Sequence, residues 1–249
     1  MLNAILQFLT TFFRRGGHRK KRYLLMLLVC TLAVPAFAAD DDAPIQDNSF
    51  LIEEAYNQEP GVVQHIFTFS RTRTGDWAGT FTEEWPVGSV RHQLSYTPIF
   101  TRADGSRSND FAFNYRLQLV GNGESRVAVA PRVTVLRDAV QVMLPASVVL
   151  TPSIVTHWNL GATSYPRTMT AGQSIVWLAS HRFNPLVETV WTRTGHTTDV
   201  VISPGIRWSY NLPHALQIVP GIAFPYDRTR HERSAFLYLS FEHPFRGEK

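Results

Sequence analysis

The sequence predicts an all-β fold: a single transmembrane, antiparallel, up-and-down β-barrel of about 12 strands, preceded by a short N-terminal helix or lead-in. Three observations predict it. Segments of roughly ten residues alternate between apolar and polar side chains, turn-like links separate them, and almost no helical periodicity follows residue 60. Charged residues make up only 18% of the 249-residue chain, below the roughly 25% that is usual in soluble domains.

The clearest alternating segment is 110–121. Phe111 and Phe113 would lie on one face of a strand and Asn114 and Arg116 on the other, because successive strand side chains point to opposite faces. The other expected strands are 62–71, 79–86, 90–101, 126–136, 139–150, 153–164, 173–183, 185–194, 200–211, 215–224 and 235–245. The total is even, as in single-chain outer-membrane barrels. Longer polar loops are expected at 101–110, 164–173 and 226–233.

A soluble β-sandwich or barrel could show the same alternation, with its apolar face buried. Three features favour a membrane barrel. The segments are longer than the usual strand of about 5–6 residues. Trp and Tyr recur near segment ends, as in aromatic girdles, and lysine is nearly absent after residue 39. We therefore expect the apolar faces to contact outer-membrane lipids.

The basic charge of the chain comes from its first residues. The formal net charge is +4, but six basic residues lie before position 23 and no acidic residue precedes Asp40. The stretch 14–22 (RRGGHRKKR), the apolar run 23–34 and the Ala-Phe-Ala of 36–38 are typical of a cleaved signal peptide over 1–38, with a single N-terminal anchor as the alternative. Cleavage would remove Cys30, the only cysteine, and with the basic head gone nothing favours nucleic-acid binding.

The remaining chain is expected to have three parts. Residues 39–60 form an acidic lead-in with a short helix or plug, whose plug or lid candidates are Phe50, Leu51 and Tyr56; a periplasmic lead-in without a role is the alternative. Residues 61–245 form the barrel and 246–249 a C-terminal tail. The last strand, which ends at Phe245, resembles the C-terminal signal that the barrel-assembly machinery reads, although four residues follow it.

The alternation also predicts which side chains line the lumen. The candidates are polar or charged and lie on the faces opposite the apolar ones: Arg91, Gln93, Asn114, Arg116, Gln118, Arg132, Glu188, Arg207, Tyr238 and Glu242. An excess of arginine would favour anions inside a channel. Alternatively, these charges pair with one another and fill the interior of a closed barrel.

No catalytic or metal-binding motif stands out. His157 and Asn159 would share a strand face near Ser147 and Ser153, but no G-x-S-x-G elbow is present, so a lipid-modifying hydrolase is the weakest alternative and we expect no enzyme. The nine histidines lack H-x-x-x-H or H-E-x-x-H spacing, and no phosphate loop or dinucleotide fingerprint occurs. We therefore expect no metal and no cofactor.

Several segments carry a family resemblance: NSFLIEEAYNQEPGVVQHI at 48–66, EEWPVG at 83–88, RHQLSY at 91–96, LPASV at 144–148 and RFNP at 182–185. Together they resemble the outer-membrane β-barrel family of transporters grouped with the meta-pathway of phenol degradation. The resemblance implies an outer-membrane, porin-like channel of a Gram-negative-type bacterium that passes small, hydrophobic or aromatic compounds passively or by facilitated passage. A structural barrel with a filled lumen and no transport is the alternative, and the solute stays unknown.

Overall fold

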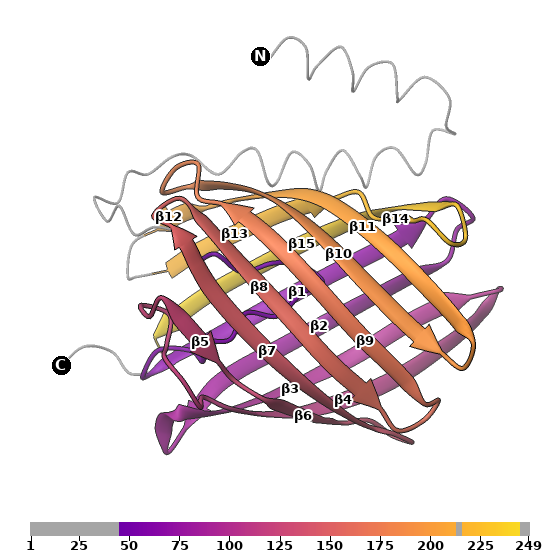
Figure 1. The fold of residues 1–249 in the computed structure, drawn as a ribbon, viewed down its shortest axis with the longest axis horizontal. Helices are drawn as coiled ribbons and strands as arrows, with labels where there is room; N and C mark the ends of the chain where they lie inside the picture. Colours follow the sequence, from indigo (N-terminus) through magenta and orange to yellow (C-terminus); the bar gives the residue numbers. More distant parts are fainter. Residues whose placement is uncertain (1–44, 213–215, 245–249) are drawn as a thin grey trace, which may run out of the picture. The chain divides into compact units, whose positions relative to one another are not determined.

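The computed structural model describes residues 45–212 and 216–244, and its strands close into a barrel (Figure 1). The strand segments are β1 (Val62–Thr72), β2 (Trp77–Val87), β3 (Ser89–Ala103), β4 (Ser106–Leu117), β5 (Val127–Val129), β6 (Arg132–Val135), β7 (Val140–Thr151), β8 (Ile154–Thr163), β9 (Thr168–Trp177), β10 (Phe183–Thr194), β11 (Thr197–Trp208), β12 (Tyr210–Leu212), β13 (Leu216–Ala223), β14 (Tyr226–Asp227) and β15 (Glu232–Pro244). None of the described residues belongs to a helix long and apolar enough to cross a membrane.

These segments make a barrel wall of 12 antiparallel strands, as the sequence predicts. β5 and β6 are one wall strand interrupted at Pro131, and β13 and β14 are another interrupted at Pro225. Proline has no N–H to donate to a ladder, so each break falls at a residue that weakens the pairing, although other strands, such as β3 and β7, continue through a proline. β12 prolongs β11 beyond Ser209. The pairing of β1 with β15, from Val62 opposite Pro244 to Thr72 opposite Ser234, closes the barrel.

Three expectations about strand boundaries are wrong. The strand expected at 173–183 is β9 at Thr168–Trp177, and 178–182 is a turn. Its first seven residues, TMTAGQS, show little alternation between apolar and polar side chains, so the pattern predicts a strand that begins too late. The stretch 101–110 is not a loop, because β3 and β4 stay paired down to Ala103 opposite Ser106. Likewise, 226–233 contains the paired ends of β14 and β15.

The wall is apolar outside and polar inside. Many of the exposed outward residues are large hydrophobic ones, including Phe67, Phe113, Val142, Leu144, Trp158, Leu160, Ile175, Trp177, Leu237 and Leu239. The buried inward residues are mostly polar, including Gln64, Glu84, Gln93, Ser147, His157, Ser174, Asn184, Ser203 and Ser240. A soluble barrel has the reverse polarity, whereas a transmembrane barrel has this one.

The barrel has two distinct ends. The terminal end holds the start of β1, the end of β15, the short links at 88 and 152–153 and the longer links 118–126 and 178–182. The hairpin end, at the opposite side, holds the links 73–76, 104–105, 136–139, 164–167, 195–196 and 228–231. Phe245, the last residue of the expected assembly signal, the tail at 246–249 and the expected signal peptide all lie outside the described residues.

Candidate functional site: the lumen and the segment within it

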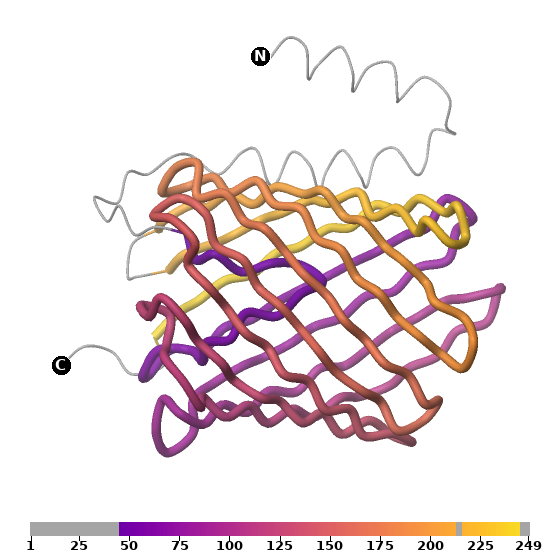
Figure 2. The backbone as a smooth tube through the Cα atoms, in the orientation of Figure 1, coloured from indigo at the N-terminus to yellow at the C-terminus, as the bar shows by residue number. Residues whose placement is uncertain are grey.

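Residues 45–60, here called the lumen segment, lie inside the barrel. Figure 2 shows this indigo stretch within the ring of strands, and its contacts run from β11 around to β1. It enters beside the link that follows β9, where the amide of Ile45 donates to the carbonyl of His181 over 2.8 Å. It then continues through Pro60 and Gly61 directly into β1.

The lumen segment contains no helix, so the helix predicted for this region is wrong. A helix satisfies each backbone amide within itself. Here the wall supplies the acceptors instead. Wall side-chain oxygens accept from the amides of Phe50, Leu51, Ile52, Glu53, Ala55, Asn57 and Gln58. The inward polar residues therefore replace the partner strand that this extended backbone lacks.

Glu188 of β10 is the most heavily used acceptor. Its Oε1 accepts from the amides of Phe50 at 2.9 Å, Leu51 at 2.6 Å and Ile52 at 3.0 Å. The residue is 0% exposed. Three converging amides solvate a carboxylate that burial would otherwise destabilise. Glu188 thus fixes the middle of the lumen segment.

Arg207 of β11 holds the entry of the same segment. Its guanidinium donates to the carbonyls of Asn48 over 2.7 Å and Gln46 over 3.2 Å. It also lies 5.0 Å from the ring centroid of Tyr238, a cation–π arrangement. The arginine is only 1% exposed. Its positive charge is therefore compensated by carbonyl oxygens of the lumen segment and by an aromatic face of the wall.

Phe50 occupies a socket in the wall. Its ring lies 5.5 Å from the ring of Phe236 and 5.3 Å from that of Tyr238, centroid to centroid. A Cβ atom added at Gly205 or Gly221 would come within 2.6 Å of the Phe50 ring. Glycine is therefore required at both positions for the ring to fit. We call Gly205, Gly221, Phe236 and Tyr238 the Phe50 socket.

Two arginines hold the second half of the lumen segment. Arg116 of β4 donates to the side-chain oxygen of Asn57 over 3.1 Å and to the carbonyl of Glu54 over 3.2 Å. Its guanidinium also lies 3.8 Å from the Glu54 carboxylate. Arg132 of β6 forms an ion pair with Glu53. Arg116 also lies 3.6 Å from the carboxylate of Glu84 in β2. These wall arginines therefore pair with acidic residues of the lumen segment, and Arg116 pairs with the wall as well.

Three wall glutamines complete this half. Gln118 accepts from the amide of Asn57 and donates to the carbonyl of Ala55, as a strand backbone would. Gln93 accepts from the amide of Gln58 over 2.7 Å. The Gln58 side chain donates to Gln64 of β1 over 2.7 Å, and Gln64 in turn donates to Glu242. The network ends where the lumen segment becomes β1.

The remaining predicted residues are placed as follows. Asn114 is buried but bonds within the wall, to Ser95 and Thr134. Arg91 is exposed at the terminal end and donates to the carbonyl of Gln118. Leu51 packs against the cluster of Phe236 and Tyr238.

Tyr56 packs over the buried side chains of Ala128 and Ala130. Its hydroxyl donates to the Asp47 carboxylate over 2.7 Å. Burial and the nearby Asp47 carboxylate raise the pKa of this hydroxyl, so it stays a donor. This contact joins the two ends of the lumen segment to each other, nine residues apart.

Ser147 and His157, considered above as a hydrolase pair, are in contact but are covered by the lumen segment. Ser147 Oγ lies 2.8 Å from His157 Nδ1, and the other ring nitrogen lies 2.9 Å from the carbonyl of Asp47. Ser147 also accepts the amide of Ala55. His157 is 0% exposed. Both side chains are thus occupied by the lumen segment and face away from the lipid side of the wall, where a lipid ester would be.

Six further residues contact the lumen segment but are not among the predicted lumen-lining residues. Gln64, Ser147, His157, Asn159, Ser174 and Asn184 all contact the lumen segment. Five of them lie on the expected strands 62–71, 139–150, 153–164 and 173–183, where the alternation is less regular than in 110–121, and Asn184 falls between two expected strands. The described residues hold no cluster of three or more His, Cys, Asp or Glu side chains that could bind a metal ion.

No protein-family model and no curated protein matches the sequence. Solved structures do share the fold. The KdgM porin matches with a TM-score of 0.56 at 10% identity, over 74% of this chain and 99% of that chain. The NanC porin matches with a TM-score of 0.55 at 9% identity, over 72% and 98%. Another KdgM porin structure, in complex with disordered oligogalacturonate, gives 0.54 at 10% identity over 74% and 99%. The chain has the barrel fold of these porins.

Proposed function

We propose that the protein is an outer-membrane channel for the passive or facilitated passage of small solutes, held closed by its lumen segment. The fold shared with the KdgM and NanC porins supports a channel. The apolar outer face supports a place in a membrane. The main observation in favour of a closed state is that one carboxylate, that of Glu188, accepts hydrogen bonds from three amides of the lumen segment.

The lumen segment is built to be separable from the wall. Its contacts with the wall are side-chain hydrogen bonds, ion pairs and one aromatic socket, and it pairs with no strand. Side-chain contacts of this kind can be exchanged for water one at a time. Displacement would leave Arg116, Arg132 and Arg207 facing Glu84, Glu188 and Glu242 across an open lumen. Positive and negative wall charges balance in that set, which favours weak charge selectivity.

The solute class follows from the lining. The family resemblance suggests hydrophobic or aromatic compounds, whereas the inward wall is lined mostly by Gln, Asn, Ser, Arg and Glu side chains. Such a lining favours hydrated, polar solutes of small size. Uptake of phenol and of a neutral sugar of similar size into protein-containing liposomes would separate the two. We expect the sugar flux to depend on the protein and the phenol flux to be close to that of empty liposomes.

A second candidate is a structural barrel without transport. It is favoured by the extent of the network between the lumen segment and the wall, which leaves the lumen occupied. Planar-bilayer conductance separates the two candidates. We expect short, rare openings from the intact protein and sustained conductance from a variant in which residues 45–58 are replaced by a Gly-Ser linker. A linker variant that inserts, shown by a heat-modifiable gel shift, but does not conduct would establish the structural role.

A disulfide that ties the lumen segment to the wall reversibly provides the matched control for the linker variant. Ser49 and Ser174 bring their hydroxyl oxygens within 2.7 Å, so a Ser49→Cys/Ser174→Cys pair can form a disulfide between the lumen segment and β9. We expect oxidation to abolish the openings and reduction to restore them. Openings that persist in the fully oxidised variant would contradict gating by this segment. Cell fractionation tests the proposed outer-membrane location. Recovery of the protein in the soluble periplasmic fraction would contradict that location.

A further inference from the structure

Arginine side chains form a row on the outward face of the barrel at the hairpin end. Arg71 of β1, Arg102 of β3, Arg107 of β4 and Arg233 of β15 are all exposed. Each is an odd number of residues away from the buried inward side chains of its own strand. Since strand side chains alternate, all four point away from the lumen.

The strand register makes this row continuous. Trp77 of β2 lies opposite both Arg71 and Arg102, and Arg102 lies opposite Arg107. In the adjoining turn, the amide of Arg73 donates to the carbonyl of Arg233 over 3.0 Å. We call Arg71, Arg73, Arg102, Arg107 and Arg233 the arginine belt. It spans β15, β1, β2, β3 and β4, which are consecutive in the wall.

The belt carries charge that the described part of the chain does not neutralise. None of its five arginines has a carboxylate within ion-pair distance among residues 45–212 and 216–244. The acidic residues nearby have other partners: Asp76 accepts the amide of Asp104, and Glu232 accepts the hydroxyl of Thr74. Directly opposed like charges such as Arg102 and Arg107 destabilise a sheet unless an anion sits between them.

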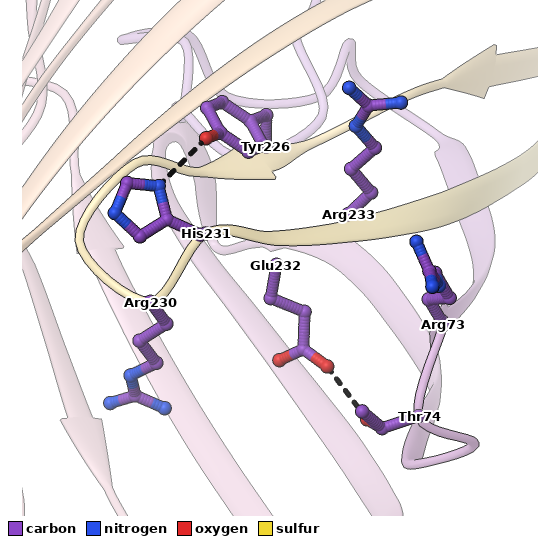
Figure 3. A pocket seen from close by; sticks show the side chains of 7 residues that line it. All are labelled: Arg73, Thr74, Tyr226, Arg230, His231, Glu232 and Arg233. Carbon is purple, nitrogen blue, oxygen red and sulfur yellow. Dashed lines mark hydrogen bonds between the residues drawn. The ribbon is translucent and has the colours of Figure 1, made fainter.

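One end of the belt opens into a pocket of about 690 Å³ (Figure 3). Its lining residues come from the β1–β2 turn, from β14, from the turn that follows β14 and from the start of β15: Arg73, Thr74, Tyr226, Arg230, His231, Glu232 and Arg233. Arg230 is already paired, at 2.8 Å, with Asp199. Arg73 and Arg233 are the two pocket arginines that belong to the belt, so their guanidinium groups are available to a bound anion.

An apolar surface lies directly below the belt. Phe69 stands two residues before Arg71 in β1, and Phe100 stands two residues before Arg102 in β3, so both lie on the outward face, closer to the middle of the wall. Their side chains are 39% and 45% exposed. Two residues of strand correspond to roughly 7 Å. A ligand held there would present anionic groups to the arginines and hydrocarbon to the phenylalanines. That combination describes an anionic lipid at the membrane surface.

We propose that the arginine belt and its pocket bind the phosphate groups of lipid A in the outer leaflet of the outer membrane. This rests on the proposed location. A chain that enters from the periplasm and crosses an even number of times leaves both ends there, so the hairpin end faces the outer leaflet. Guanidinium groups bind phosphate oxygens through paired N–H donors, and several arginines in a row suit a sugar headgroup that carries two phosphates.

Binding of fluorescent lipid A to the refolded full chain in nanodiscs tests the proposal. Arg73→Gln/Arg233→Gln should lower the affinity for diphosphorylated lipid A roughly 25-fold, because each arginine in contact with the phosphates contributes about fivefold. The control is Arg167→Gln/Arg193→Gln, which removes the same charge at the same end but from the β8–β9 link and β10. The control should change the affinity by less than about threefold, because these two arginines lie outside the pocket and would attract the phosphates only through long-range charge, which salt screens.

Comparison of lipids with different headgroups tests whether the phosphates are recognised. Lipid A stripped of its phosphates but with identical acyl chains should bind the parent protein as weakly as the pocket variant does. Equal affinity for both forms, or equal losses in the two arginine pairs, would overturn the proposal. Equal affinity for phosphatidylglycerol would reduce the belt to a general anionic-lipid surface and also overturn it. Lipid binding does not require an open channel, so failure of the channel proposal in a conductance assay would leave this result unchanged.

Discussion

The two halves of the lumen segment are held in different ways. Residues 45–52 rely on a few concentrated contacts: the Glu188 carboxylate, the Arg207 guanidinium and the Phe50 socket. Residues 53–60 rely on many dispersed ones, with Arg116, Arg132, Asn159, Ser147 and three wall glutamines each contributing one or two bonds. The second half is also continuous with β1. Release should therefore start in the first half, where one lost anchor frees three residues at once.

The largest expected effect is that of Glu188→Ala. It leaves the amides of Phe50, Leu51 and Ile52 without their buried acceptor, and hydrogen bonds to a charged group contribute about 1.5–3 kcal/mol each. Because the three bonds share one oxygen, their contributions do not simply add. We expect the free energy that holds residues 50–52 against the wall to fall by about 4 kcal/mol. Hydrogen exchange at these amides should accelerate while exchange at Asn57 and Gln58 hardly changes. Glu188→Gln, which keeps an acceptor oxygen, is the control and should lose less.

Next comes Phe50→Ala, which empties the socket. We expect the free energy that holds the lumen segment in the barrel to fall by about 3 kcal/mol. This is at the low end for the loss of a phenylalanine ring, because Phe50 is only half-buried. Channel openings in a planar bilayer should become more frequent. Gly221→Ala provides an independent route to the same result, since its Cβ would displace the Phe50 ring. If Gly221→Ala opens the channel no more often than the parent, the socket is not an anchor.

The smallest effect is expected in the second half. The Arg132–Glu53 pair is partly exposed, with side-chain exposures of 19% and 25%, so solvent weakens it. A double-mutant cycle with Arg132→Gln and Glu53→Gln should give a coupling of about 1 kcal/mol or less, measured by exchange at Ala55 and Asn57. A coupling as large as the loss from Glu188→Ala would erase the distinction between the halves.

Much of the wall could be read from the sequence. The alternation around Phe113 and Arg116 assigns both residues to the faces that the structure gives them, because a period of two leaves only two choices. β9 was displaced by about five residues in the prediction. Its inward residues Gly172 and Ser174 are small and face the lumen segment, so the usual contrast between apolar and polar positions is blurred there.

The lumen segment could not be read in the same way. Its apolar spacing suggested a helix, since Phe50, Leu51, Ala55 and Tyr56 fit a helical face. Local propensity was overridden by acceptors that lie more than 90 residues away along the chain, such as Ser147 and Glu188. The Ser147–His157 contact likewise depends on the pairing of β7 with β8 and on the segment that covers it.

The sequence by itself determined a polar-inside, apolar-outside barrel wall, because strand periodicity is local and each residue carries its own assignment. The tertiary structure alone decided that the lumen is occupied and by what. Burying Glu188 and Arg207 is favourable only when the amides and carbonyls of residues 46–52 compensate them, and those partners meet only once the strands have closed into a ring. The arginine belt has the same origin, because the register of β15 with β1–β4 places separate arginines side by side.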